Sequence, residues 1–166
     1  SFVAKDFKLL GVDKKYYTLN SIKGSKGTLI CFICNHCPYV KEIIYDLVKE
    51  TNELREYGIS SVAIMPNDVN TYPEDSFDNM VLFSKSNRLN IPYLYDEYQN
   101  VAKLYNAVCT PEFFGFDKNL ILKYRGRINN PKNKNDRELF SAMTSIANKK
   151  DISFNNPSIG CSIKWK

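Results

Sequence analysis

The stretch G-T-L-I-C-F-I-C-N-H-C-P, residues 27–38, decides the fold of this chain. Residues Thr28 to Ile33 are apolar and rich in β-branched and aromatic side chains, which predicts a strand buried on both faces. From Val40 onward, apolar residues recur at helical spacing with charged residues between them, which predicts an amphipathic helix. Pro38 fits the first helical turn, where no N–H donor is needed. The sequence therefore predicts a strand-to-helix junction that carries Cys34 to Cys37.

A Cys-x-x-Cys pair at such a junction is typical of thiol–disulfide chemistry. We expect Cys34 at or just before the helix N-terminus, where free N–H groups and the helix dipole favour a thiolate. Cys37, one turn further on, is placed to close a disulfide and expel a group bonded to Cys34. His36 is the only histidine of the chain, and its protonated form would lower the pKa of Cys34 further.

Two other interpretations of the cysteines are open. Cys31, Cys34 and Cys37 occur at intervals of three, a spacing compatible with a metal or iron–sulfur site. Such a site needs a fourth ligand, and the remaining cysteines, Cys109 and Cys161, lie far along the chain. Unreactive, buried thiols are the other interpretation. Redox chemistry fits the junction best, so we predict no metal and no other cofactor.

Length and composition indicate one globular domain with an ordinary core, since the chain has 166 residues and 43% hydrophobic residues. No apolar run reaches the length of a membrane span and no leader pattern opens the chain, so we expect a cytoplasmic protein without membrane contact. Because the sequence starts at Ser1, a leader further upstream stays open. Five cysteines, clustered in one motif, favour a working dithiol over a secreted disulfide scaffold.

The net charge of +5 is mild, and basic residues gather in one region. We interpret that region as a solvated hairpin and loop and predict no nucleic-acid partner, because no nucleic-acid motif accompanies it. The basic residues concerned are Lys118, Lys123, Arg125, Arg127, Lys132 and Lys134.

The remaining elements alternate in type along the chain. A β-hairpin within residues 1–22 precedes the junction, and a buried strand at 59–65 should lie parallel to the first one through a right-handed crossover. Further on we predict a helix at 76–88, a strand at 91–95, a helix at 100–107 with Val101, Leu104 and Tyr105 inward, a hairpin formed by 112–116 and 120–124, and a helix at 136–148.

The polar loop from Asn67 to Asp75 leaves the carboxyl end of a predicted parallel strand, the edge where open α/β sheets bind ligands. Asp68 is a candidate proton acceptor there, although a role in the turn itself is favoured. At the other end of the chain, Ile159, Cys161, Ile163 and Trp165 alternate with polar residues or glycine. This alternation predicts that residues 151–166 form an extended tail whose apolar face docks on the domain of residues 1–150, or on a partner.

Three motifs carry a resemblance to known proteins: Cys34-Asn-His-Cys37-Pro38-Tyr-Val-Lys41, Cys109-Thr110-Pro111-Glu-Phe-Phe114, and the ending Gly160-Cys161-Ser-Ile-Lys-Trp-Lys166. Together with the element order, they resemble the thioredoxin superfamily. More narrowly, they resemble its peroxiredoxin-like branch that keeps a thioredoxin-type Cys-x-x-Cys, an AhpC/TSA-like redoxin domain. The resemblance implies an α/β, thioredoxin-like fold in which helices flank a central mixed sheet, with an N-terminal β-hairpin extension.

The resemblance also implies roles for individual residues. Cys34 matches the attacking cysteine, Cys37 the resolving one, and Pro111 a cis-proline that faces them. His36, Pro38 and Thr110 are supporting residues; a cis bond would turn the backbone of Thr110 toward the dithiol, ready to pair with an extended peptide.

Some positions depart from the parent families. Thioredoxins carry a tryptophan just before the first cysteine and a buried aspartate six residues before it, and Ile33 and Thr28 occupy those positions here. The usual internal proton acceptor is therefore missing. In peroxiredoxins a proline and a threonine precede the peroxidatic cysteine by seven and three residues; counted from Cys37, these are Ile30 and Cys34. Cys37 thus aligns with the peroxidatic position.

The leading hypothesis is a thiol–disulfide oxidoreductase that uses Cys34 and Cys37 on protein or small-molecule thiols and disulfides, with a thioredoxin or glutathione system as reductant. The first alternative is a thiol peroxidase with Cys37 peroxidatic. The second is a non-enzymatic module that binds a partner beside Pro111 or a metal through Cys31, Cys34, Cys37 and His36. Cys109 and Cys161 are possible extra redox thiols. Substrate, direction of electron flow and oligomeric state stay open.

Overall fold

Strand β3 (Gly27–Phe32) lies inside the main sheet, and all six of its residues are buried. It pairs in parallel with β4 (Ile59–Met65) on one side and antiparallel with β7 (Glu112–Asp117) on the other. The structure, a computed structural model, describes residues 1–152 and 154–166. Among these residues, seven strands form one mixed sheet in the order β2-β1-β5-β4-β3-β7-β8. The other strands of this sheet are β1 (Lys8–Gly11), β2 (Tyr16–Thr18), β5 (Tyr93–Tyr95) and β8 (Leu122–Gly126).

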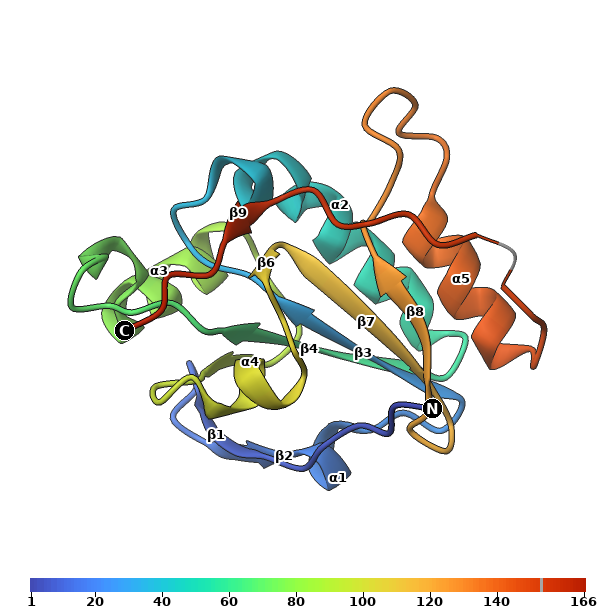
Figure 1. The fold of residues 1–166 in the computed structure, drawn as a ribbon, viewed down its shortest axis with the longest axis horizontal. Helices are drawn as coiled ribbons and strands as arrows, with labels where there is room; N and C mark the ends of the chain where they lie inside the picture. The colour runs from blue at the N-terminus through green and yellow to red at the C-terminus, as the bar shows by residue number, and fades with distance from the viewer. Residues whose placement is uncertain (153) are drawn as a thin grey trace.

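Helices cover both faces of this sheet (Figure 1). On one face, alternate residues of β3 such as Leu29 and Cys31 pack with helices α2 and α5. On the other face, Ile30 and Phe32 pack with the N-terminal segment, α1 and α4. The helical elements are α1 (Leu19–Ile22), α2 (Pro38–Arg55), the 3₁₀ turn η1 (Pro73–Asp75), α3 (Phe77–Ser86), α4 (Asn100–Leu104) and α5 (Glu138–Ala147). The predicted thioredoxin-like fold with its N-terminal hairpin is confirmed.

Two local predictions differ from the structure. The N-terminal hairpin is followed directly by the short helix α1, which the apolar pattern of the sequence does not predict. The hydroxyl of Thr18 caps this helix. Helix α4 ends at Leu104 rather than at residue 107, and Leu104 is 49% exposed instead of facing inward. Val101 and Tyr105 are buried as predicted, since they alone of the three face the cluster beneath α4.

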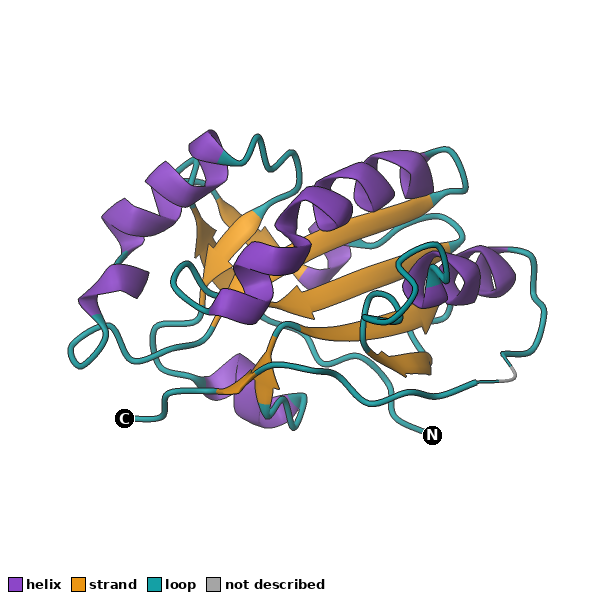
Figure 2. Cartoon of the chain, turned by 90° about the horizontal axis from the view of Figure 1, so that it is seen from above, coloured by secondary structure: helices purple, strands orange, loops and turns teal. Residues whose placement is uncertain are grey.

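The C-terminal segment crosses the molecule as a strap (Figure 1). Its strand β9 (Cys161–Ser162) pairs antiparallel with β6 (Cys109–Thr110), and Figure 2 shows this two-stranded ladder apart from the main sheet. Ile163 is buried, whereas Ile159 and Trp165 are exposed, so only part of the alternating apolar face packs on the body.

No helix in the described part of the chain combines the length and the apolarity that crossing a membrane requires.

A buried carboxylate links the two long helices on one face of the sheet. Glu50 of α2 is 3% exposed, and its Oε2 lies 3.5 Å from Nε of Arg137, the residue that precedes α5. Arg137 also donates to Glu53 at 2.5 Å. Burial raises the pKa of Glu50 to about 7, since the charge of Arg137 offsets only part of the desolvation.

This shift predicts how stability depends on pH. The folded-state pKa of Glu50 exceeds its ordinary value of 4.5, so its stabilising contribution is complete below that value and is lost as the pH rises through about 7. We expect Glu50→Gln to flatten the fall in the free energy of unfolding between about pH 5 and pH 8, measured by urea titration. Glu56→Gln, at an exposed position at the end of α2, is the matched control. An equal fall in wild type and Glu50→Gln would contradict the prediction.

Candidate active site

Two cysteines of the junction and one residue of β6 form the centre of the site. The loop that holds Cys34 and Cys37 follows β3, and the peptide bond Thr110–Pro111 that faces it is cis. The Cys34 Sγ lies 3.5 Å from the Thr110 hydroxyl, and the Cys37 Sγ lies 3.4 Å from the Thr110 carbonyl oxygen. The structure therefore brings together the residues on which the sequence hypothesis depends.

Both thiols of the motif are shielded from solvent. Cys34 is 0% and Cys37 1% exposed, and both belong to the apolar cluster beneath α2. All five cysteines are free. A buried thiolate is unfavourable unless hydrogen-bond donors surround it, so the donors around each sulfur decide which one carries the charge.

Those donors gather around Cys37. Helix α2 begins at Pro38, which makes Cys37 the residue at its N-terminal cap. The interaction with Cys34 lowers the pKa of Cys37 most, and Cys161 and the backbone N–H of Val40, near the start of the helix, lower it further. Together they lower its pKa to about 4 against the effect of burial. They outweigh the contact with the Thr110 carbonyl, to which only the protonated thiol can donate.

The proton of the pair therefore resides on Cys34. Its hydrogen bond to Cys37 raises the pKa of Cys34 most, followed by burial and by the negative charge of Asp75. Cys34 lies in the loop just before α2, as expected, and Pro38 is in the first helical turn, while Cys37 is the residue at the N-terminal cap. The helix N-terminus therefore favours an anion at Cys37 more than at Cys34.

This distribution of charge is testable by the ultraviolet absorbance of the thiolate. The reduced protein should keep one thiolate from about pH 8 down to about pH 5, and Cys37→Ser should abolish it. Cys34→Ser weakens the largest stabilising hydrogen bond, so the pKa of Cys37 should rise. Cys31→Ser, in the buried strand, should leave the titration unchanged. A thiolate that appears only near the ordinary value of 9.0 would contradict the assignment.

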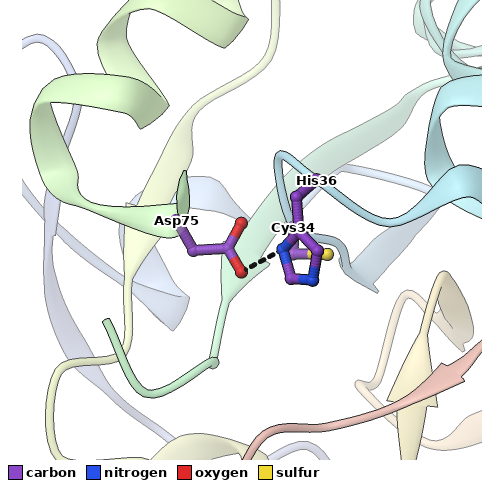
Figure 3. Close-up of side chains that lie close together, drawn as sticks. All are labelled: Cys34, His36 and Asp75. Atoms are coloured by element: carbon purple, nitrogen blue, oxygen red, sulfur yellow. Dashed lines mark ion pairs between the residues drawn. The ribbon is translucent and has the colours of Figure 1, made fainter. Parts of the chain in front are cut away.

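A buried carboxylate that the sequence did not single out lies beside the motif. Asp75, at the end of η1, is fully buried and accepts hydrogen bonds from the Asn35 N–H at 2.8 Å and from the Asn67 amide at 3.0 Å. Its Oδ2 lies 2.6 Å from Nδ1 of His36 (Figure 3). A distant segment of the chain thus places a buried carboxylate beside Cys34 and His36, whereas position 28 carries none.

His36 faces this carboxylate and stacks on Tyr72, with the ring centroids 5.6 Å apart. The negative charge of Asp75 acts on Cys34 and raises the pKa of its thiol. Asn35 is also held by hydrogen bonds, since its side chain donates to the Glu74 carbonyl and accepts from the Tyr93 hydroxyl. The middle residues of the motif thus anchor the loop to η1.

Removing the charge of Asp75 should make Cys34 more acidic. We expect Asp75→Asn to lower the pKa of the Cys34 thiol, because a nearby anion disfavours a second one. Titrating Cys34 in a Cys37→Ser background isolates its signal. Asp68→Asn is the control. The Asp68 carboxylate accepts hydrogen bonds from Asn70 and Thr71 within its own turn, the role that the sequence favoured for it. A pKa of Cys34 that stays unchanged in Asp75→Asn would contradict this role.

Three side chains could hold a metal ion. The donor atoms of Cys34, His36 and Asp75 all lie within 4.8 Å of one another (Figure 3). Zinc usually takes four ligands, so this group falls one short of a structural site. Cys31, which the sequence offered as a further metal ligand, is not part of this group. Its thiol faces the Val62 carbonyl at 3.5 Å.

The two remaining cysteines flank the site differently. Cys109 is half-buried and its thiol contacts the Pro111 carbonyl oxygen at 3.7 Å; burial raises its pKa to about 12. Cys161 is half-buried too, but it pairs with Thr110, whose carbonyl oxygen contacts the Cys37 sulfur. Of these two candidates for an extra redox thiol, Cys161 is therefore the one that is held opposite the residue contacting both sulfurs of the dithiol.

A Cys-x-x-Cys at the junction of β3 and α2, opposite a cis-proline, defines a thiol redox enzyme of the thioredoxin superfamily. The chain belongs to the AhpC/TSA family, whose model matches residues 3–125. A search of curated proteins gives no match.

Solved structures match the chain over nearly all of its length. An uncharacterized conserved protein from Geobacillus kaustophilus is 41% identical, with a TM-score of 0.95 over 99% of this chain and 91% of that one. A hypothetical protein from Sinorhizobium meliloti is 35% identical, with a TM-score of 0.94 over 99% and 93%. A thiol:disulfide interchange protein of the thioredoxin family from Chlorobium tepidum shares the fold at 19% identity, with a TM-score of 0.70 over 87% and 95%.

Proposed function

We propose that this protein is a thiol–disulfide oxidoreductase whose Cys34–Cys37 dithiol exchanges two electrons with a substrate disulfide. The observation that carries the proposal is the contact of both sulfurs with one residue, Thr110, while their shared proton leaves Cys37 ionised. A thiolate and a neighbouring thiol are the two groups that disulfide exchange needs.

The chemistry follows from this arrangement. The Cys37 thiolate attacks one sulfur of the substrate disulfide, forms a mixed disulfide and expels the first substrate thiolate. Cys34 then loses its proton and attacks the Cys37 Sγ, which expels the second thiolate and leaves a Cys34–Cys37 disulfide. Asp75 is the buried base nearest to Cys34 in the described site and is suited to take up that proton. A reductant of the thioredoxin or glutathione type restores the dithiol.

The surroundings of Pro111 are suited to a substrate with an apolar side chain. A groove beside this proline is lined by apolar and aromatic residues together with the charged Glu42, Arg127 and Lys134. The lining includes Tyr39, Ile43, Pro111, Phe113, Ile128 and Ile159. Protein or peptide thiols and disulfides are therefore the substrate class we propose.

The test follows disulfide formation and exchange in the same samples. After equilibration with reduced and oxidised glutathione, the tryptic peptide 27–41 of wild type should lose two hydrogens, the mark of a Cys34–Cys37 bond. Cys37→Ser should lower the exchange rate with a protein disulfide at least about a hundredfold, because it removes the thiolate. Cys31→Ser, in the same peptide, should exchange like wild type. Wild-type exchange in Cys37→Ser would contradict the proposal.

A thiol peroxidase is the second candidate, favoured by the ionised Cys37 at a helix N-terminus. A peroxide would oxidise Cys37 to a sulfenic acid and leave as an alcohol or water. The Cys34 thiol would then condense with it, forming the disulfide and releasing water. Peroxide consumption that requires Cys37 and outpaces disulfide exchange would assign the protein to this class.

A further inference from the structure

The tail occupies the backbone edge that lies next to the dithiol. In the β6–β9 ladder, Cys161 stands opposite Thr110. The approach is as close as two backbones allow, because a Cβ added to Gly160 would lie 2.3 Å from the Thr110 carbonyl oxygen. The same chain therefore provides an extended strand, with a cysteine in it, where an exchanging peptide would need to pair.

Thr110 connects the three cysteines of this region. Its hydroxyl lies 3.5 Å from the Cys34 sulfur, its carbonyl oxygen lies 3.4 Å from the Cys37 sulfur, and it pairs with Cys161 across the ladder. Cys161 is also among the groups that lower the pKa of Cys37. Cys34 and Cys37 are buried, whereas Cys161 is half-buried. Cys161 is thus the member of the group that solvent reaches.

Hydrogen bonds on either side of the ladder keep the tail in this position. The Ile163 N–H donates to the Val108 carbonyl, and the Asp68 N–H donates to the Lys164 carbonyl at 2.8 Å. Asn67 accepts from the Lys164 N–H at 2.9 Å and donates to Asp75, so one side chain joins the tail to the buried carboxylate. A substrate that reached Cys37 directly would have to break these bonds.

We propose that Cys161 is a third redox residue, which forms an alternative disulfide with Cys37 and so relays exchange between the buried dithiol and outside thiols. The proposal rests on the proposed function, which supplies the Cys34–Cys37 disulfide. Cys161, after losing its proton, attacks the Cys37 Sγ; the Cys34–Cys37 bond breaks, and the released Cys34 thiolate takes up a proton. No electrons are gained or lost in this step.

The second half of the relay transfers the disulfide outward. An outside thiolate attacks the Cys161 Sγ and expels the Cys37 thiolate, whose low pKa makes it a good leaving group. A second outside thiol then attacks the mixed disulfide, which releases Cys161 and an external disulfide. The protein ends as the Cys34–Cys37 dithiol, and the two outside thiols have been oxidised. The reverse sequence reduces an external disulfide.

The first test removes the competing partner of Cys37. Cys34→Ser and, in parallel, Cys34→Ala are reduced and treated with one equivalent of oxidised glutathione. The expected product is a Cys37–Cys161 disulfide, seen as tryptic peptide 27–41 linked to peptide 151–164 with loss of two hydrogens. A stable glutathione adduct on Cys37, or a link to peptide 104–118 that carries Cys109, would overturn the proposal.

A second variant moves Cys161 without removing any sulfur. Gly160→Ala, in the Cys34→Ser background, places a methyl group against the Thr110 carbonyl and should lift the tail from β6. The yield of the Cys37–Cys161 link should fall at least about tenfold, since the two sulfurs are no longer held together. The single tryptophan, Trp165, lies on the same tail and reports the displacement by fluorescence. An unchanged yield with a displaced tail would overturn the proposal.

The relay itself is tested with Cys34 present. Cys161→Ser should slow exchange with a protein disulfide at least about tenfold, while its Cys34–Cys37 bond still forms. Ser162→Ala, the exposed neighbour on β9, is the control and should exchange like wild type. Full exchange in Cys161→Ser overturns the relay and leaves the proposed function intact. Failure of wild type to form the Cys34–Cys37 bond defeats the proposed function instead, whatever Cys161 does.

Discussion

The site depends on the contact between Thr110 and two thiols that are shielded from water. A buried sulfur keeps a negative charge only where donors replace its lost hydration, and the backbone around Thr110 positions those donors. Its hydroxyl contacts Cys34, its carbonyl contacts Cys37, and its strand pairs with the tail that brings the Cys161 N–H to the same sulfur. The reactivity of the dithiol is therefore a property of three chain segments rather than of the motif alone.

Asp75 adds the second constraint. It is fully buried and lies close to Cys34, so ionising that thiol would place two anions beside each other in a medium of low polarity. Cys37, by contrast, lies at the first turn of an 18-residue helix whose free N–H groups favour an anion. The two environments separate the pKa values of two chemically identical groups, which is the usual origin of distinct acid and nucleophile roles in one site.

Much of the fold was predictable because its signals are local. The apolar run of β3, the periodicity of α2 and the strand pattern of β4 each lie within one stretch of sequence, and they fix the junction that holds Cys34 and Cys37. The cis bond of Pro111 and its position opposite the dithiol were predicted only from the resemblance. The role of its neighbour Thr110 followed from that prediction. Asp75 carried no signal, because it lies in a polar turn and its burial arises from contacts with Asn35, 40 residues away.

The ionisation of the pair was unpredictable for a related reason. Pro38 marked the helix start, but the relative acidity of Cys34 and Cys37 also depends on Asp75 and Cys161, which lie far from the motif in the sequence. Leu104 shows another limit of local patterns: its spacing matched the inward positions, but it is the last residue of α4 and is 49% exposed. Tertiary pairing of the tail with β6 added donors that no local pattern contains.

The β6–β9 ladder also closes an edge of the backbone. Without it, the N–H and C=O groups of Cys109 and Thr110 would stand unpaired beside a reactive thiolate, and any extended chain in the surroundings could add to them. Because the protein pairs these groups with its own strand, an outside chain would have to displace β9 before it could add to β6. The tail therefore restricts strand addition at the place where such an encounter would become covalent.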